Sequence, residues 1–228
     1  MAFAFTAIKT RYALERRRWD EAAKLSLPPE SLGGFPWARF PWAKAQIQYA
    51  RAIGAARSGD AATAREAVEK LAEIRQALVV AKGDYDWAKQ VEIQHQAASA
   101  WLAHVDGKND EALRLMRAAA DLEDATDKHP VTPGAILPAR EMLGDLLSEL
   151  KQPSLALKEY EKSLESSPNR FNSIFGAARA AELARDNTKA RTYYEKVIAL
   201  SNQSDGSRPE LQQTRKYLAK RGHRGVRP

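Results

Sequence analysis

Cysteine is missing from this chain of 228 residues, so neither a disulfide nor a thiolate metal site is available. That absence does not separate a cytoplasmic from a periplasmic protein. No apolar run approaches the roughly 20 residues that a helix needs to cross a bilayer. The first residues, Met1 to Lys9, have no basic region ahead of their apolar patch and lead into an arginine-rich stretch. We therefore predict a mature or cytoplasmic start, with the periplasm as the alternative if the chain is part of a longer exported protein.

Recognisable catalytic motifs are also lacking. The sequence contains no G-x-S-x-G nucleophile turn, no phosphate-binding loop and no dinucleotide fingerprint. Gly33-Gly34 lies between prolines and opens no helix. No cofactor is predicted, and the enzyme classes that depend on these motifs are excluded.

Net positive charge is small outside one end of the chain. The net charge is +7, from 36 basic and 29 acidic residues. The last fourteen residues carry +6 of it without any acid, on Arg215, Lys216, Lys220, Arg221, Arg224 and Arg227. This basic end contains no tryptophan or phenylalanine for stacking on bases, and the rest of the chain is nearly neutral. A solubilising end is therefore favoured over a contact with nucleic acid or anionic lipid, and nucleic acid is disfavoured as the main partner.

The sequence does contain a recurring helical unit, which is clearest from Leu137 to Pro168. Its pattern is two helices and a turn, with key positions at Arg140, Leu143, Gly144, Leu147, Ala156, Tyr160 and Pro168. The spacing is that of a tetratricopeptide repeat in which the tryptophan is replaced by Arg140. The next unit, Phe171 to Leu200, follows at the strict 34-residue period.

Weaker copies can be aligned on the alanine that opens the second helix of each unit. These alanines are Ala22, Ala64, Ala112, Ala156 and Ala190, at spacings of 42, 48, 44 and 34 residues. The extra residues are assigned to the segments 28–41, near 82, and 125–136. Small residues are expected at helix contacts, at Ala52, Ala100, Gly144 and Ala178, with a larger residue sixteen positions later, at Val68, Met116, Tyr160 and Tyr194.

These units predict an all-α, right-handed superhelical solenoid of about five irregular helix-turn-helix repeats with a C-terminal capping helix at 210–220. A degenerate first repeat spans 1–27, with Phe5, Ile8, Tyr12 and Leu14 at helical spacing. A Pro/Gly/aromatic loop follows at 28–41, and its aromatics Phe35, Trp37, Phe40 and the adjacent Trp42 are expected to fold against the array. The array and cap occupy 42–220, and a disordered basic tail is predicted at 221–228. The stiff segment 128–134 is predicted to fix the angle between two halves, or else to contact a partner.

Beyond the repeat itself, the run from Asp121 to Asp124, through Lys128-His129-Pro130-Val131-Thr132-Pro133-Gly134, to Leu137-Pro138-Ala139-Arg140-Glu141 resembles the C-terminal part of longer bacterial tetratricopeptide proteins of unassigned activity. The resemblance covers most of the chain and implies protein or peptide binding rather than catalysis. It gives no residue a functional role. Chaperone-binding members hold a peptide carboxylate with lysine, arginine and asparagine on their first helices. The corresponding positions here include the acids Glu141, Asp145 and Glu149, which disfavours that mode.

The predicted binding surface is a concave groove lined by the first helix of each repeat. Its residues are Gln46, Tyr49, Gln94, Trp101, His104, Glu141, Asp145, Glu149, Asn172, Arg179 and Glu182. Aromatics beside mixed charge suit a peptide with an apolar anchor and a basic residue. The alternative is that the aromatics pack between helices and the charges are merely solvated.

A metal site is disfavoured. Glu92 and His95 have a Glu-x-x-His spacing that His129 might complete, but a di-metal site needs a second such pair and none exists. The sequence thus favours a non-catalytic scaffold that binds a protein or peptide and that could form a homo-oligomer. A binder of nucleic acid or anionic surfaces through the basic end is the alternative, and a metal-dependent enzyme is third.

Overall fold

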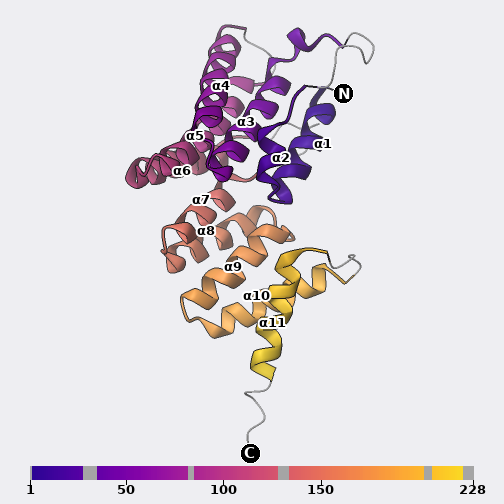
Figure 1. The fold of residues 1–228 in the computed structure, drawn as a ribbon, viewed down its shortest axis with the longest axis vertical. Helices are drawn as coiled ribbons and strands as arrows, with labels where there is room; N and C mark the ends of the chain where they lie inside the picture. Colours follow the sequence, from indigo (N-terminus) through magenta and orange to yellow (C-terminus); the bar gives the residue numbers. More distant parts are fainter. Residues whose placement is uncertain (1, 28–34, 82–84, 128–133, 203–206, 223–228) are drawn as a thin grey trace, which may run out of the picture. The chain divides into compact units, whose positions relative to one another are not determined.

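The computed structural model describes residues 2–27, 35–81, 85–127, 134–202 and 207–222. In these residues it contains eleven α-helices and one 3₁₀ helix, and no strand. The helices are α1 (Ala2–Glu15), α2 (Trp19–Ala23), α3 (Pro41–Ser58), α4 (Ala61–Ala81), α5 (Trp87–Val105), α6 (Asn109–Asp124), α7 (Ala139–Glu149), α8 (Pro153–Ser166), α9 (Phe171–Leu183), α10 (Asn187–Leu200) and α11 (Pro209–Gly222), with η1 at Trp37–Arg39 (Figure 1). The predicted all-α helical-repeat architecture is confirmed.

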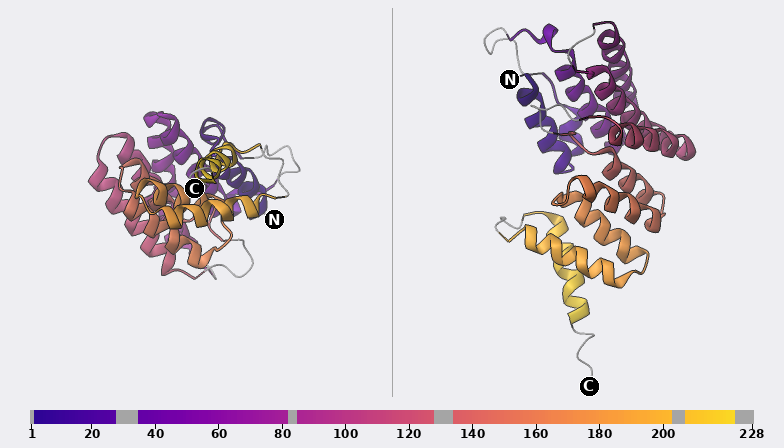
Figure 2. Two further views of the ribbon diagram at one scale, coloured as in Figure 1. Left: turned by 90° about the horizontal axis from the view of Figure 1, so that it is seen from below. Right: turned by 180° about the vertical axis from the view of Figure 1, so that it is seen from behind.

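Two compact units divide the chain, unit 1 at Met1–Met142 and unit 2 at Leu143–Pro228. Within unit 1, α3 packs on both α4 and α5, and the three helices lie side by side in Figure 1 and in the right-hand view of Figure 2. Within unit 2, α9 packs between α8 and α10, and α11 packs on α10. Most of these helices therefore pack on the next one or two helices along the chain, as in a repeat array.

One turn recurs in all five helix pairs of the described residues. A residue with positive φ ends the first helix, at Arg17, Gly59, Gly107, Lys151 and Arg185. The next residue then donates its N–H to the carbonyl five positions earlier, as in Asp60 to Ala55 at 2.9 Å and Asp186 to Ala181 at 2.9 Å. This arrangement satisfies carbonyls that a helix end leaves unpaired. Its spacing follows the alignment on the five alanines, all of which are fully buried.

Aspartates begin two of the five second helices. Asp60 accepts the N–H of Thr63 at 3.0 Å, and Asp186 accepts that of Lys189 at 3.0 Å. The hydrogen bonds from the Thr63 hydroxyl and N–H lower the pKa of Asp60 below its usual range. The residue with positive φ is thus common to all five pairs, whereas the aspartate cap is found in two of them.

The predicted small residues at helix contacts are buried, and three of the four larger residues sixteen positions later are too. Met116, Tyr160 and Tyr194 are fully enclosed, whereas Val68 is half-buried and its neighbours Ala67 and Leu71 fill that place. The buried residues of α4, the longest of the described helices, are thus Ala64, Ala67 and Leu71.

The aromatic loop packs as predicted where it is described. Trp37 is buried with Ala2 and Ala43, and Phe35, Phe40 and Trp42 pack against that cluster. The ring of Trp42 stacks on Trp87 of α5, with centroids 4.3 Å apart and an interplanar angle of 11°. Residues 28–34 lie outside the described residues, as do residues 128–133 of the predicted stiff segment.

The structure adds detail at both ends of the described chain. Three of the four helically spaced apolar residues of α1 face outward, because Ala2, Thr6, Ala7, Thr10, Ala13 and Leu14 form the buried face instead. At the other end, α11 extends two residues beyond the predicted bound of the array at 220. Since no glycine or proline interrupts the helix before Gly222, α11 continues to that residue; residues 223–228 lie outside the described residues.

The ring of Tyr160 is enclosed by two glycines, one from α7 and one from α9. A Cβ placed on Gly144 would lie 2.7 Å from the ring, and a Cβ on Gly176 would be closer still. We expect Gly176→Ala to lower the free energy of unfolding by about 1 kcal/mol, because the ring must shift in a packed interior and the better helix propensity of alanine offsets only part of that cost. Urea denaturation followed by circular dichroism measures this change. In a Tyr160→Met background the same Gly176→Ala substitution should be close to neutral, and an equal cost in both backgrounds would contradict the ring contact.

Candidate binding surfaces

Four of the predicted groove residues lie in the packed interior of unit 1. They are Gln46, Tyr49, Trp101 and Glu141. Gln46 accepts a 2.7 Å hydrogen bond from the hydroxyl of Thr6 in α1, and the Tyr49 hydroxyl lies 3.2 Å from the sulfur of Met142. A buried side chain cannot touch a ligand without a change in packing, so these positions serve first to hold the unit together.

Other segments of the same chain cover part of the predicted groove in unit 1. Arg11 of α1 donates to the carbonyl oxygens of Gly134 at 2.8 Å and Ala135 at 3.1 Å. Ile136 and Leu137 are buried in the same segment. Residues 134–142 thus run against α1 and α3, which is why residues that the repeat pattern assigns to an open groove are enclosed here.

In the rest of the predicted groove of unit 1, an arginine side chain lies over two tryptophan rings. The guanidinium of Arg57 lies over the ring of Trp101 at 4.1 Å and over that of Trp19 at 5.1 Å. His104 meets the Trp101 ring edge-on, and its Nδ1 lies 2.8 Å from Oδ1 of Asn109. His104 and Gln94 are half-buried. Sequence reasoning missed Arg57, although its position one turn beyond Ile53 on the same face signals it.

Unit 2 keeps more of the predicted surface accessible. Glu149 and Arg179 are exposed, and Asp145 and Glu182 are half-buried. Asn172 is buried, and its side-chain oxygen lies 3.4 Å from Nη1 of Arg208, whose guanidinium covers the Phe171 ring at 4.2 Å.

Two of the unit 2 carboxylates accept hydrogen bonds from buried tyrosines. The Tyr160 hydroxyl donates to Asp145 at 2.6 Å, and the Tyr194 hydroxyl donates to Glu182 at 2.7 Å. Burial, and then the bond to Glu182, raise the pKa of the Tyr194 hydroxyl well above its usual range. Tyr160 and Tyr194 occupy the same position in successive repeats, but their carboxylate partners do not, since Asp145 aligns with Arg179 and Glu182 aligns with Ser148.

The third alternative is a metal site at Glu92, His95 and His129, but Glu92 already interacts with two other side chains. Its carboxylate lies 2.8 Å from Arg75 and accepts a 2.6 Å hydrogen bond from Gln96. Burial lowers the pKa of His95, against the opposing charge of Glu92. His129 lies outside the described residues, and within the described ones no group of three or more His, Asp or Glu is placed to hold a metal ion.

The basic end is partly built into unit 2. Leu211, Thr214 and Tyr217 of α11 are buried, and the Tyr217 ring lies 4.4 Å from that of Tyr194. Arg215, Lys216 and Lys220 are on the exposed face of the same helix. Contact of this end with nucleic acid or anionic lipid stays a prediction.

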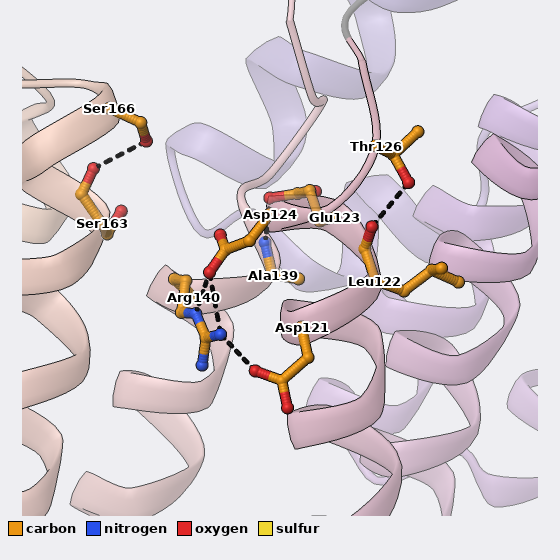
Figure 3. Close-up of polar contacts among 9 residues, drawn as sticks. All are labelled: Asp121, Leu122, Glu123, Asp124, Thr126, Ala139, Arg140, Ser163 and Ser166. Carbon is orange, nitrogen blue, oxygen red and sulfur yellow. Dashed lines mark hydrogen bonds and ion pairs between the residues drawn. The ribbon is translucent and has the colours of Figure 1, made fainter.

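The distinctive run at 121–141 forms an ion-pair cluster within unit 1. Figure 3 shows Arg140 at the start of α7 directed to Asp121 and Asp124 at the end of α6. Its Nε donates to Asp124 at 2.9 Å, and the backbone N–H of Ala139 donates to Glu123 at 2.9 Å. The guanidinium is almost wholly buried. The acidic run therefore caps the start of α7 and fixes its direction, with Arg140 in the place where the repeat pattern has tryptophan.

Comparisons with known proteins agree with the repeat pattern. A family model described as tetratricopeptide repeat matches residues 137–170. A comparison with curated proteins gives no match. None of the helices in the described part of the chain is long and apolar enough to span a membrane. The chain thus contains a tetratricopeptide repeat at residues 137–170, within an all-helical series of pairs that share one turn geometry.

Proposed function

We propose that this chain is a non-catalytic scaffold that binds a protein or peptide through the first helices of its repeats. Helical repeat arrays present extended surfaces of this kind. In unit 2 the first helices are α7 and α9, and the accessible polar groups on them are Asp145, Glu149, Arg179 and Glu182.

The observation that carries the proposal is the pair of tyrosine-held carboxylates. The Tyr160 hydroxyl holds Asp145 and the Tyr194 hydroxyl holds Glu182. A carboxylate has about four lone-pair sites, so it can accept hydrogen bonds from a ligand as well as from a tyrosine. Because both side chains are already oriented, a cationic group binding there loses less side-chain entropy.

The charge of this surface favours a basic ligand. Three carboxylates stand against one guanidinium, that of Arg179. A peptide with lysine or arginine residues at the spacing of α7 and α9 complements this arrangement, and such complementarity contributes mainly to specificity and association rate.

We test this with random peptides displayed on phage and selected on the immobilised full chain. We expect the selected peptides to be rich in lysine and arginine, and we expect Glu149→Lys to weaken their binding about tenfold, because a reversed charge both removes an attraction and adds a repulsion. Isothermal titration calorimetry measures the dissociation constant. Binding should also weaken as the salt concentration rises.

Glu165→Lys provides the matched control, since Glu165 is exposed on α8, the second helix of the same pair. Equal effects of the two substitutions would show a dependence on net charge alone and would reject the α7 and α9 surface. Lys216→Glu tests the alternative function, which is binding of nucleic acid or an anionic surface through the basic end. This substitution leaves the packed face of α11 intact, whereas a deletion from residue 215 would remove buried Tyr217.

A further inference from the structure

An apolar stripe lies exposed along α1. It consists of Phe5, Ile8 and Tyr12, whose exposed fractions are 47%, 69% and 51%. Phe5 also meets the ring of Phe35 edge-on, and Arg18 lies over the Tyr12 ring at 5.0 Å. We call these three residues the α1 outer stripe.

The repeat register identifies the α1 outer stripe as a helix-stacking face. Ala22 and Ala64, which are equivalent in the repeat alignment, are 42 residues apart. With the same offset, Phe5, Ile8 and Tyr12 align with Ile47, Ala50 and Gly54 of α3, all of which are buried. The corresponding residues of α9 are Ser173, Gly176 and Ala180, which are also buried. Each residue of the α1 outer stripe therefore aligns with residues that are buried in α3 and in α9.

Those later helices use this face to contact the second helix of the preceding pair. Ser173 lies 3.1 Å, oxygen to oxygen, from Ser163 of α8, and Gly176 faces the Tyr160 ring of the same helix. At the third position a Cβ on Gly54 would lie 2.7 Å from that of Ala22 in α2. By continuity of this interface, the α1 outer stripe has the geometry to receive one further helix.

Residue size and charge define that helix. The stripe carries two rings and an isoleucine where α9 has serine, glycine and alanine, so the incoming helix must lie further away than the 8 to 10 Å of a close contact. Charged residues in and just after α1 are five basic, Lys9, Arg11, Arg16, Arg17 and Arg18, against one acid, Glu15. We propose that the α1 outer stripe docks an amphipathic helix with acidic flanks from another protein chain. This surface belongs to unit 1 and is independent of the peptide surface proposed in unit 2.

The full chain is tested with two peptides taken from its own second helices, each held helical by a side-chain lactam on its polar face. The first, residues 109–124, is an amphipathic helix with five acids and two arginines. The second, residues 187–200, has one acid and three basic residues and serves as the control of opposite charge. We expect the acidic peptide to bind and the basic one to bind at least tenfold more weakly, as measured by fluorescence anisotropy.

Ile8→Glu should weaken binding of the acidic peptide at least tenfold. Val80→Glu, which changes an apolar residue of α4 that is 76% exposed, should leave binding unchanged. The proposal is overturned by the absence of binding up to about 1 mM peptide, which corresponds to a free energy near −4 kcal/mol, by equal binding of the two peptides, or by equal effects of the two substitutions. Dimerisation of the free chain that Ile8→Glu abolishes, seen by analytical ultracentrifugation, would also overturn it by assigning the stripe to a second copy.

Discussion

Replacing both Asp121 and Asp124 by asparagine is expected to lower the free energy of unfolding of this chain by about 3 kcal/mol. The substitutions leave the Arg140 guanidinium, whose side chain is only 8% exposed, without the two carboxylates that neutralise it. A buried charge that loses its partners retains its desolvation cost and gains nothing in return. We place the effect at the lower end of the range for buried pairs because the Asp121 side chain is 72% exposed and screened by water.

The converse substitution gives an internal check. Arg140→Met should cost about 1 kcal/mol or less, since the carboxylates are on the exposed side of the cluster and return to water when the cation is removed. Urea denaturation followed by circular dichroism measures both changes. Glu111→Gln with Asp127→Asn is the matched control, because it removes two negative charges from exposed side chains in and after α6 and none from the Arg140 cluster. A larger loss for Arg140→Met than for the aspartate pair would contradict the burial argument.

The Arg140 cluster also marks what the sequence could and could not predict. The acidic run 121–124 and Arg140 are recognisable as a distinctive pattern, and the repeat spacing places Arg140 where tryptophan is usual. Their pairing could not be inferred, because sixteen or more residues separate the partners and the path of the connecting segment decides whether they meet. Local spacing predicts a helix and its neighbours well, but it does not predict where an insertion leads the chain.

The same reason explains why part of the predicted groove is buried. Local signals place helix starts, stops and buried alanines, since each depends on residues within one turn, as in Asp60 and Gly59. The burial of Tyr49 depends instead on contacts far along the chain: Met142 of α7 contacts Tyr49, and residues 134 and 135, in the insertion before α7, accept hydrogen bonds from α1. Of the predicted groove residues on α7 and α9, Asp145, Glu149, Arg179 and Glu182 stay accessible, whereas Glu141 and Asn172 are buried. The use of this surface for binding stays a prediction.

The outward face of α1 shows a second limit. Helical spacing of Phe5, Ile8 and Tyr12 indicates a helix correctly but not which face is buried, because an apolar stripe is equally compatible with a core and with an interface. The threonines account for the choice of face. The Thr10 hydroxyl donates to the carbonyl of Thr6 in its own helix, and the Thr6 hydroxyl donates to Gln46 of α3, so both can be buried at little cost. A polar residue that bonds to its own helix can occupy a core that hydrophobicity alone would not assign to it.

Gly54→Ala is expected to destabilise the chain by about 2 kcal/mol, although alanine is the better helix former. The added methyl group would meet the backbone N of Ala23 and lie 2.6 Å from the carbonyl oxygen of Trp19. Backbone atoms cannot rotate away as a side chain can, so α2 as a whole must move from α3. Unfolding in urea measures the loss.

Gly134→Ala is the control for this substitution, since a Cβ there has nothing within 4 Å. It should leave the free energy of unfolding within about 0.5 kcal/mol of the wild-type value. Comparison with Gly176→Ala then distinguishes a glycine that faces backbone atoms from one that faces a tyrosine ring. If the Gly54 substitution costs no more than the Gly176 one, α2 yields as readily as a tyrosine ring, and its contact with α3 is not a rigid one.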